Sequence, residues 1–204
     1  MNFLAHAFLA GDDPADQLGG LMGDFVKGPL PAGLPPDVAE GVRLHRRIDV
    51  FADTHPAFQR SRARCAVHRR RVSGIVVDMA YDHFLARHWA RYQPDLLTTF
   101  SARMYALMDA HAHWLPERLE RILPRMRDDD WLASYADARN VVRALERIAL
   151  RLRRPDALLG AGDDFLGDYA GFESDFFAFI DDAAEFARVH RLQRTPPRPD
   201  VGRT

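Results

Sequence analysis

The spacing of apolar residues restricts this chain to helices. Apolar side chains recur three and four residues apart along most of the sequence, which is the period of an amphipathic helix. One such stripe runs through residues 38–51, and others run through residues 76–90, 141–152 and 172–183. We find no segment of strand length in which apolar and polar residues alternate, as a half-buried strand requires. We therefore predict an all-α protein.

Prolines and glycines divide this helical pattern into about eight to ten predicted helices. The main breaks fall at residues 28–36, at Pro56 and at later single prolines. A length of 204 residues without an internal repeat fits one domain, so we predict a single-domain helical bundle over residues 1–192. Residues 193–204 are rich in proline and almost without apolar side chains, and we expect them to form a disordered tail.

The composition excludes several classes of protein. Hydrophobic residues make up 47% and charged residues 28%, which is an ordinary globular balance. A single cysteine rules out a disulfide framework and a four-thiolate zinc site. No run approaches the roughly 18 consecutive apolar residues of a membrane span. The apolar start is too short for a secretory signal and lacks a basic leader. We therefore predict a cytoplasmic protein that does not enter a membrane.

The net charge of −1 hides two strongly charged blocks. Residues 43–71 hold nine arginines and two acids, a net charge of +7, whereas residues 155–190 have a net charge of −8. The basic block fits either a solvated face or a surface for an anionic partner. Because no aromatic residues interleave the arginines of residues 60–71 and the whole chain is nearly neutral, we do not expect nucleic acid. An acidic protein is the favoured partner, with contacts from Arg60, Arg64 and Arg71.

Three predicted helical segments in the first ninety residues carry His and Asp beside their apolar stripes. These residues are Asp24, His45, Asp49, Asp78, Asp82 and His83. Within the pairs His45/Asp49 and Asp78/Asp82 the residues lie four apart, and on a helix they share one face. A carboxylate in apolar surroundings must be paired, hydrogen-bonded or bound to a cation, because burying a bare charge is costly.

Imidazole and carboxylate groups together suit Mn²⁺, Fe²⁺, Zn²⁺ or Mg²⁺ with open positions for water and phosphate oxygens. The predicted ligands are Asp24, His45, Asp78, Asp82 and His83. Arg46 and Arg47 follow His45 directly, and a guanidinium group matches phosphate geometry, so we expect them to contact an anionic substrate. Each residue also has a simpler interpretation, as a helix pair or a surface residue. His6, which lies within an apolar stripe, is expected to be a core histidine bonded to a carbonyl.

Four motifs in this order resemble the acyl carrier protein phosphodiesterase family. They are MNFLAHAFLA, GDFVKG, HRRIDVFAD and YDHFLARHW, all within residues 1–93. The resemblance implies an all-α fold akin to the HD phosphohydrolases. It also implies hydrolysis of the phosphodiester that joins 4′-phosphopantetheine to a serine of holo acyl carrier protein. A divalent cation, usually manganese, is implied as the cofactor.

The resemblance places all six His and Asp residues listed above at the site, and among them we predict Asp24, His45 and Asp49 as catalytic. Metal and arginine together suit an anionic phosphodiester, and the basic block suits an acidic carrier protein. The sequence therefore predicts a metal-dependent phosphodiesterase acting on holo acyl carrier protein. Two alternatives stay open at this point. One is an HD-like phosphohydrolase of nucleotides, and the other is a non-catalytic all-α module that binds an acidic protein.

Overall fold

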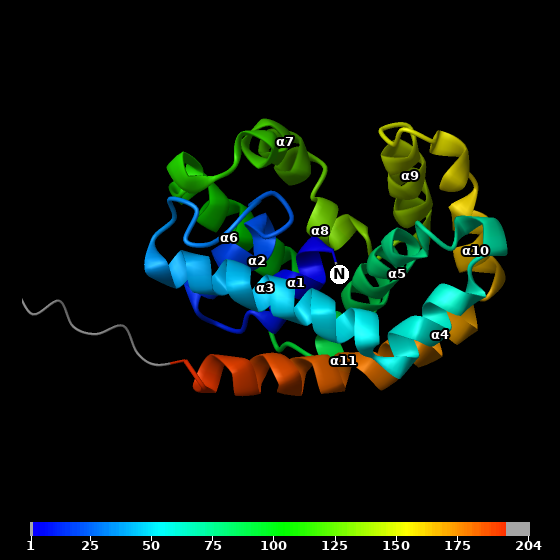
Figure 1. Cartoon of the computed structure of the whole chain (residues 1–204), viewed down its shortest axis with the longest axis horizontal. Helices are drawn as coiled ribbons and strands as arrows, with labels where there is room; N and C mark the ends of the chain where they lie inside the picture. The colour runs from blue at the N-terminus through cyan, green and yellow to red at the C-terminus, as the bar shows by residue number, and fades with distance from the viewer. Residues whose placement is uncertain (1, 195–204) are drawn as a thin grey trace, which may run out of the picture.

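The computed structural model describes residues 2–194, and these residues form eleven α-helices and four short 3₁₀ helices without a strand (Figure 1). The all-α prediction is confirmed. The helix count exceeds the expected eight to ten because short helices escape a periodicity argument. The helices are α1 (Phe3–Leu9), α2 (Pro14–Met22), α3 (Pro36–Thr54), α4 (Pro56–Arg64), α5 (Ser73–Arg87), α6 (Leu97–Ala110), α7 (Glu117–Asp128), α8 (Trp131–Ser134), α9 (Ala138–Ala149), α10 (Ala161–Gly167) and α11 (Tyr169–Leu192).

The predicted tail falls outside the described residues from residue 195 onward. Across residues 2–194, no helix combines the length and the apolar character that crossing a bilayer demands. The likeness to the HD phosphohydrolase fold stays a prediction.

Helix α5 forms the centre of the fold because it is buried on nearly every side. Val76, Ala80 and Phe84 are fully buried, and so are residues on its other faces. Helix α11 runs along one side of the molecule (Figure 1) and contributes a row of buried phenylalanines to the same core. Helix α3 begins directly after Pro35, as the sequence predicts, and presents its apolar face to α2 and α11.

Glycines let α2 pack against α3 at unusually short range. A Cβ atom added to Gly19 would lie 2.4 Å from the Gly41 carbonyl carbon, and one added to Gly41 would lie 2.7 Å from the Ala15 oxygen. On the same helix, a Cβ at Gly20 would lie 3.0 Å from the His6 oxygen. Backbone therefore meets backbone where α1, α2 and α3 join, and no larger residue fits between them.

A buried carboxylate fixes α1 on the central helix. Asp82 of α5 is fully buried, and its two oxygens accept hydrogen bonds from Leu4 N at 2.9 Å and Ala5 N at 3.0 Å. The first N–H groups of a helix have no partner within the helix, and a carboxylate is favoured at that end. Burial raises the pKa of Asp82 to about 7. This contact sets the position of α1 and therefore of His6.

We predict that Gly19→Ala and Gly41→Ala each lower the free energy of unfolding by about 1–3 kcal/mol, because the added methyl group meets rigid backbone. Gly74→Ala is the matched control: this helical glycine has nothing within 4 Å of an added Cβ. Alanine there should be neutral or stabilising by up to about 1 kcal/mol. Urea denaturation of the three variants measures the difference. Equal stabilities for all three would contradict the close α2–α3 contact.

Candidate active site

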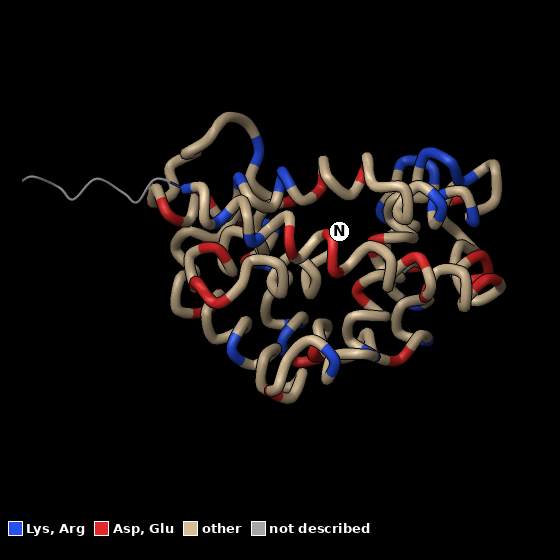
Figure 2. The backbone as a smooth tube through the Cα atoms, turned by 90° about the horizontal axis from the view of Figure 1, so that it is seen from below, with Lys and Arg blue, Asp and Glu red and all other residues tan. Residues whose placement is uncertain are grey.

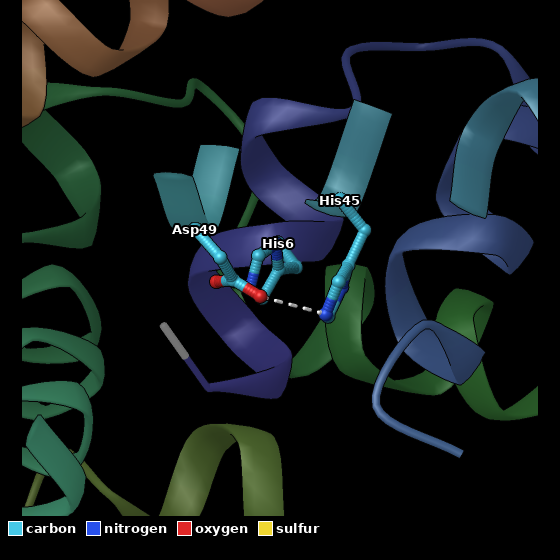
Figure 3. A group of neighbouring side chains, drawn as sticks. All are labelled: His6, His45 and Asp49. Atoms are coloured by element: carbon cyan, nitrogen blue, oxygen red, sulfur yellow. Dashed lines mark ion pairs between the residues drawn. The ribbon is translucent and has the colours of Figure 1, made fainter. Parts of the chain in front are cut away.

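Helix α3 supplies the centre of the site from two residues on one face. His45 is buried, and its Nε2 lies 3.2 Å from Asp49 Oδ2, one helical turn away (Figure 3). On the other side of the ring, Nδ1 lies 2.8 Å from the Gly20 carbonyl oxygen of α2. A carbonyl accepts only from an N–H, so Nδ1 carries a proton and Nε2 faces the carboxylates. The predicted pairing of His45 with Asp49 is confirmed.

His6 of α1 completes the group, although the sequence analysis assigned it to the core. Its ring stacks on that of His45 with centroids 3.6 Å apart, and its Nε2 lies 3.1 Å from Asp49 Oδ1 (Figure 3). The residue is buried, but within the described residues neither of its ring nitrogens makes a hydrogen bond of acceptable geometry. The expected bond to a carbonyl is therefore wrong. Buried polar atoms without partners are rare, and they indicate a site built for a ligand.

Without a bound cation, the pKa values of the two stacked imidazoles shift in opposite directions. Burial, reinforced by the neighbouring charge of His45, lowers the pKa of His6 to about 3. Burial also acts to lower the pKa of His45, but hydrogen bonds to Asp24 and Asp49 outweigh it and raise that pKa to about 9. Although burial acts to raise it, the pKa of Asp49 lies far below its usual range because both histidines contact the carboxylate. The Asp49 carboxylate is therefore ionised where it contacts both rings.

Asp24 lies at the rim of the group, just beyond the end of α2. Its Oδ1 is 3.5 Å from His45 Nε2, and its side chain is 59% exposed. Desolvation acts to raise the pKa of Asp24, but the hydrogen bond and charge of His45 lower it. Gly23 makes this approach possible, because a Cβ there would lie 2.3 Å from the His45 ring.

An open pocket of about 320 Å³ gives solvent access to these groups. It is lined by Gly23, Asp24, Val26, Lys27, Gly28, His45, Arg46 and Asp49. Arg46 holds the loop that forms this pocket, since its guanidinium donates to Val26 O at 2.9 Å and Gly28 O at 3.0 Å. Arg46 is thus a positioning residue, and Lys27 is the exposed cation beside Asp24.

One ligand atom from each of His6, His45 and Asp49 lies within 4.8 Å of the other two. This donor set, two nitrogens and a carboxylate oxygen, is typical of divalent transition-metal sites with open positions. The lack of a well-formed hydrogen bond at either ring nitrogen of His6 fits such a site better than it fits a packed core. The three residues could therefore hold a divalent cation, with Asp24 near enough to contribute.

Two of the predicted metal ligands have structural roles instead. Asp82 uses both oxygens on the N-terminus of α1, as described above. His83 is fully buried, with Nδ1 2.7 Å from Tyr135 O and Nε2 2.7 Å from the Tyr169 hydroxyl. Neither ring nitrogen is left for a metal, so His83 joins α5 to α8 and α11. The prediction of metal ligands fails at these two residues because spacing along one helix does not reveal which neighbouring helix each of its faces contacts.

Asp78 lies on the edge of the site. It is part-buried on α5, and burial raises its pKa, with a further contribution from the charges of Asp49 and Asp24. The compact group of three ligand atoms does not include it. A role for Asp78 as a ligand stays a prediction.

The basic block is largely neutralised within the molecule, which corrects the predicted docking surface. Arg60 Nε and Arg64 Nε each lie 2.8 Å from an oxygen of Asp175, a buried residue of α11. Arg69 pairs with Asp164 at 3.0 Å. Figure 2 shows basic and acidic residues interspersed at the end of the molecule formed by α4 and α10. The two charged blocks of the sequence therefore stabilise the α4–α11 interface.

The remaining predicted substrate contacts stay on the surface. Arg47 is exposed beside His190 of α11, and the two side chains are in contact. Arg71 is exposed and forms no ion pair with any residue in the described part of the chain. A role for Arg47 or Arg71 in binding substrate stays a prediction.

Comparison with known proteins identifies similar chains. The family model described as acyl carrier protein phosphodiesterase matches residues 1–183. An acyl carrier protein phosphodiesterase of Photorhabdus laumondii is 36% identical over 180 residues, which cover 88% of this chain and 91% of that protein. Proteins of the same name from Pectobacterium atrosepticum and Serratia proteamaculans are each 33% identical over 193 residues, covering 94% of this chain and all of theirs. No solved structure matches.

The corrected role of the basic block predicts a difference between two arginines. Arg64→Ala should lower the free energy of unfolding by about 1–3 kcal/mol, because it removes a charged hydrogen bond from buried Asp175. Arg71→Ala should change it by less than about 0.5 kcal/mol, since Arg71 is exposed. Guanidinium denaturation of both variants distinguishes these outcomes. Equal stability of the two variants would show that Arg64 does not stabilise the α4–α11 interface.

Proposed function

This chain belongs to the acyl carrier protein phosphodiesterase family, and we propose that it hydrolyses the phosphodiester joining 4′-phosphopantetheine to a serine of holo acyl carrier protein. The products are apo carrier protein and free 4′-phosphopantetheine. The observation that carries the proposal is the group of His6, His45 and Asp49, of which His45 and Asp49 line an open pocket. A nucleotide phosphohydrolase and a non-catalytic binding module are not favoured, because the family match spans most of the chain.

The proposal includes a divalent cation, with Mn²⁺ as the preferred ion. His6 and His45 would supply nitrogen ligands and Asp49 a carboxylate oxygen. The lack of a well-formed hydrogen bond at the His6 nitrogens supports this assignment. Such an ion polarises a phosphoryl oxygen and lowers the pKa of bound water. The carbonyl of Gly20 supports the ligand role of His45, because its bond with Nδ1 directs Nε2 into the pocket.

The other residues of the pocket would act on the substrate directly. Asp24 is ionised and exposed next to His45, so it can accept a proton from an attacking water. Lys27 lines the same pocket and can contact a phosphoryl oxygen that gains negative charge during hydrolysis. Arg46 keeps both residues in place through its bonds to the loop. The proposal places the protein in the cytoplasm and includes no nucleic acid.

We predict that His6→Phe lowers the rate of 4′-phosphopantetheine release by at least about 100-fold, which exceeds the loss expected for a residue that only supports a ligand. Phenylalanine retains the shape that stacks on His45, so the helical circular dichroism spectrum should be unchanged. Mass spectrometry of holo carrier protein before and after incubation with enzyme and Mn²⁺ measures release. His68→Phe is the control, because His68 is exposed and does not line the pocket.

Two results would count against the proposal. If the wild-type protein with Mn²⁺ leaves the mass of holo carrier protein unchanged, the assigned reaction is wrong. If His6→Phe keeps wild-type turnover while folded, His6 is a packing residue and the three-residue group is not the catalytic centre.

A further inference from the structure

A second and larger cavity adjoins the candidate active site. It has a volume of about 500 Å³ and is formed by α1, α5, the α7–α8 region and α9. In Figure 1 these helices surround the N-terminal end of α1. Binding sites for small molecules commonly have volumes of about 300–1,000 Å³. We call this cavity the α7–α9 cleft.

The cleft and the active-site pocket share a wall. Asp24 lines both cavities, and its neighbour Phe25 lines the cleft. Asp24 is also the residue at the rim of the His6–His45–Asp49 group. A molecule with one end at that group therefore has a direct route past Asp24 into the cleft.

The lining of the cleft combines apolar walls with unused hydrogen-bond donors. Phe25, Ile122, Trp131 and Ile148 supply apolar surface. Trp131 Nε1 is buried and has no hydrogen-bond partner among the residues that the structure describes. A buried indole N–H normally has an acceptor. A ligand with a carbonyl group inside the cleft would provide one.

The cleft also has cations that form no ion pair within the described residues. Four exposed arginines line it: Arg118, Arg143, Arg147 and Arg151. In contrast to Arg60 and Arg64, none of these four forms an ion pair within residues 2–194. Asp24 and Asp129 are the acidic residues of the same lining, so the cleft carries a surplus of positive charge. It therefore fits a ligand whose carbonyl groups accept hydrogen bonds from these guanidinium groups.

We propose that the α7–α9 cleft binds the 4′-phosphopantetheine arm of the substrate, an inference that rests on the proposed function. The arm is a chain with a phosphate at one end, two amide groups, a dimethyl-substituted carbon and a terminal thiol. With its phosphate at the His6–His45–Asp49 group, the arm passes Asp24 and enters the cleft. Its amide carbonyls accept from Trp131 Nε1 and the arginines, and its methyl and methylene groups contact the apolar walls. The carrier protein then lies on the opposite side of the scissile phosphate.

The test fills the cleft without touching the proposed catalytic group. Ala144 lines the cleft on α9, and Ala144→Trp would occupy part of its volume. Glu146→Trp is the matched control, because it adds the same side chain to the exposed surface of the same helix outside the cleft. Isothermal titration calorimetry, with Mn²⁺ present, measures binding of free 4′-phosphopantetheine and of apo carrier protein to each full-length variant. Neither ligand contains the phosphodiester that the enzyme would hydrolyse.

We expect Ala144→Trp to weaken the binding of 4′-phosphopantetheine at least tenfold and to leave the Kd of apo carrier protein unchanged. Glu146→Trp should leave both values unchanged. Trp131→Phe provides a second variant that keeps the shape of the wall and removes only the N–H donor. It should weaken 4′-phosphopantetheine binding several-fold with the same selectivity.

Two outcomes would overturn the proposal. Unchanged 4′-phosphopantetheine binding in both Ala144→Trp and Trp131→Phe would mean that the arm lies elsewhere. Equal weakening of 4′-phosphopantetheine and apo carrier protein would mean that the cleft contacts the protein surface instead. Failure of the wild-type enzyme to release the arm from holo carrier protein would reject the proposed function alone, because the binding measurements on the cleft do not depend on turnover.

Discussion

The close approach of α2 to α1 and α3 is the constraint on which the site depends. Gly19 and Gly41 bring backbone against backbone, and Gly23 leaves room for the His45 ring. With any larger residue at these positions, the two helices would separate by the width of a side chain. The Gly20 carbonyl would then no longer meet His45 Nδ1, and the two imidazoles would not stack at 3.6 Å. The glycines therefore determine both the packing of these helices and the geometry of the imidazole groups.

Buried polar contacts position the helices around this junction. Asp82 holds α1 against α5, and His83 joins α5 to α8 and α11. Asp175 of α11 forms ion pairs with Arg60 and Arg64 of α4. Each contact satisfies a charge or hydrogen-bonding group that would be costly to bury alone. His6 differs from these residues, because neither of its buried ring nitrogens makes a well-formed hydrogen bond within the described part of the chain.

The sequence predicts the all-α class and, in the candidate site, the pairing of His45 with Asp49. It does not predict the contacts of the other residues, and the reasons are physical. His45 and Asp49 are neighbours on one helix, so their pairing follows from helical spacing alone. His6, Asp82 and His83 make contacts with partners more than forty residues away, and their helices do not specify those partners. The opposite charges of residues 43–71 and 155–190 were a usable signal for internal pairing, because adjacent blocks of opposite sign attract. An exposed docking surface was predicted instead.

The central claim is that His6, His45 and Asp49 together form the metal centre of a phosphodiesterase. The most direct measurement is anomalous X-ray scattering from crystals of the protein grown with Mn²⁺, recorded on both sides of the manganese absorption edge. We expect one anomalous peak at the point where the two imidazole Nε2 atoms and the Asp49 carboxylate converge. A peak beside Asp78 or Asp82 without contact to His6, or no peak in the pocket at saturating Mn²⁺, would contradict the claim.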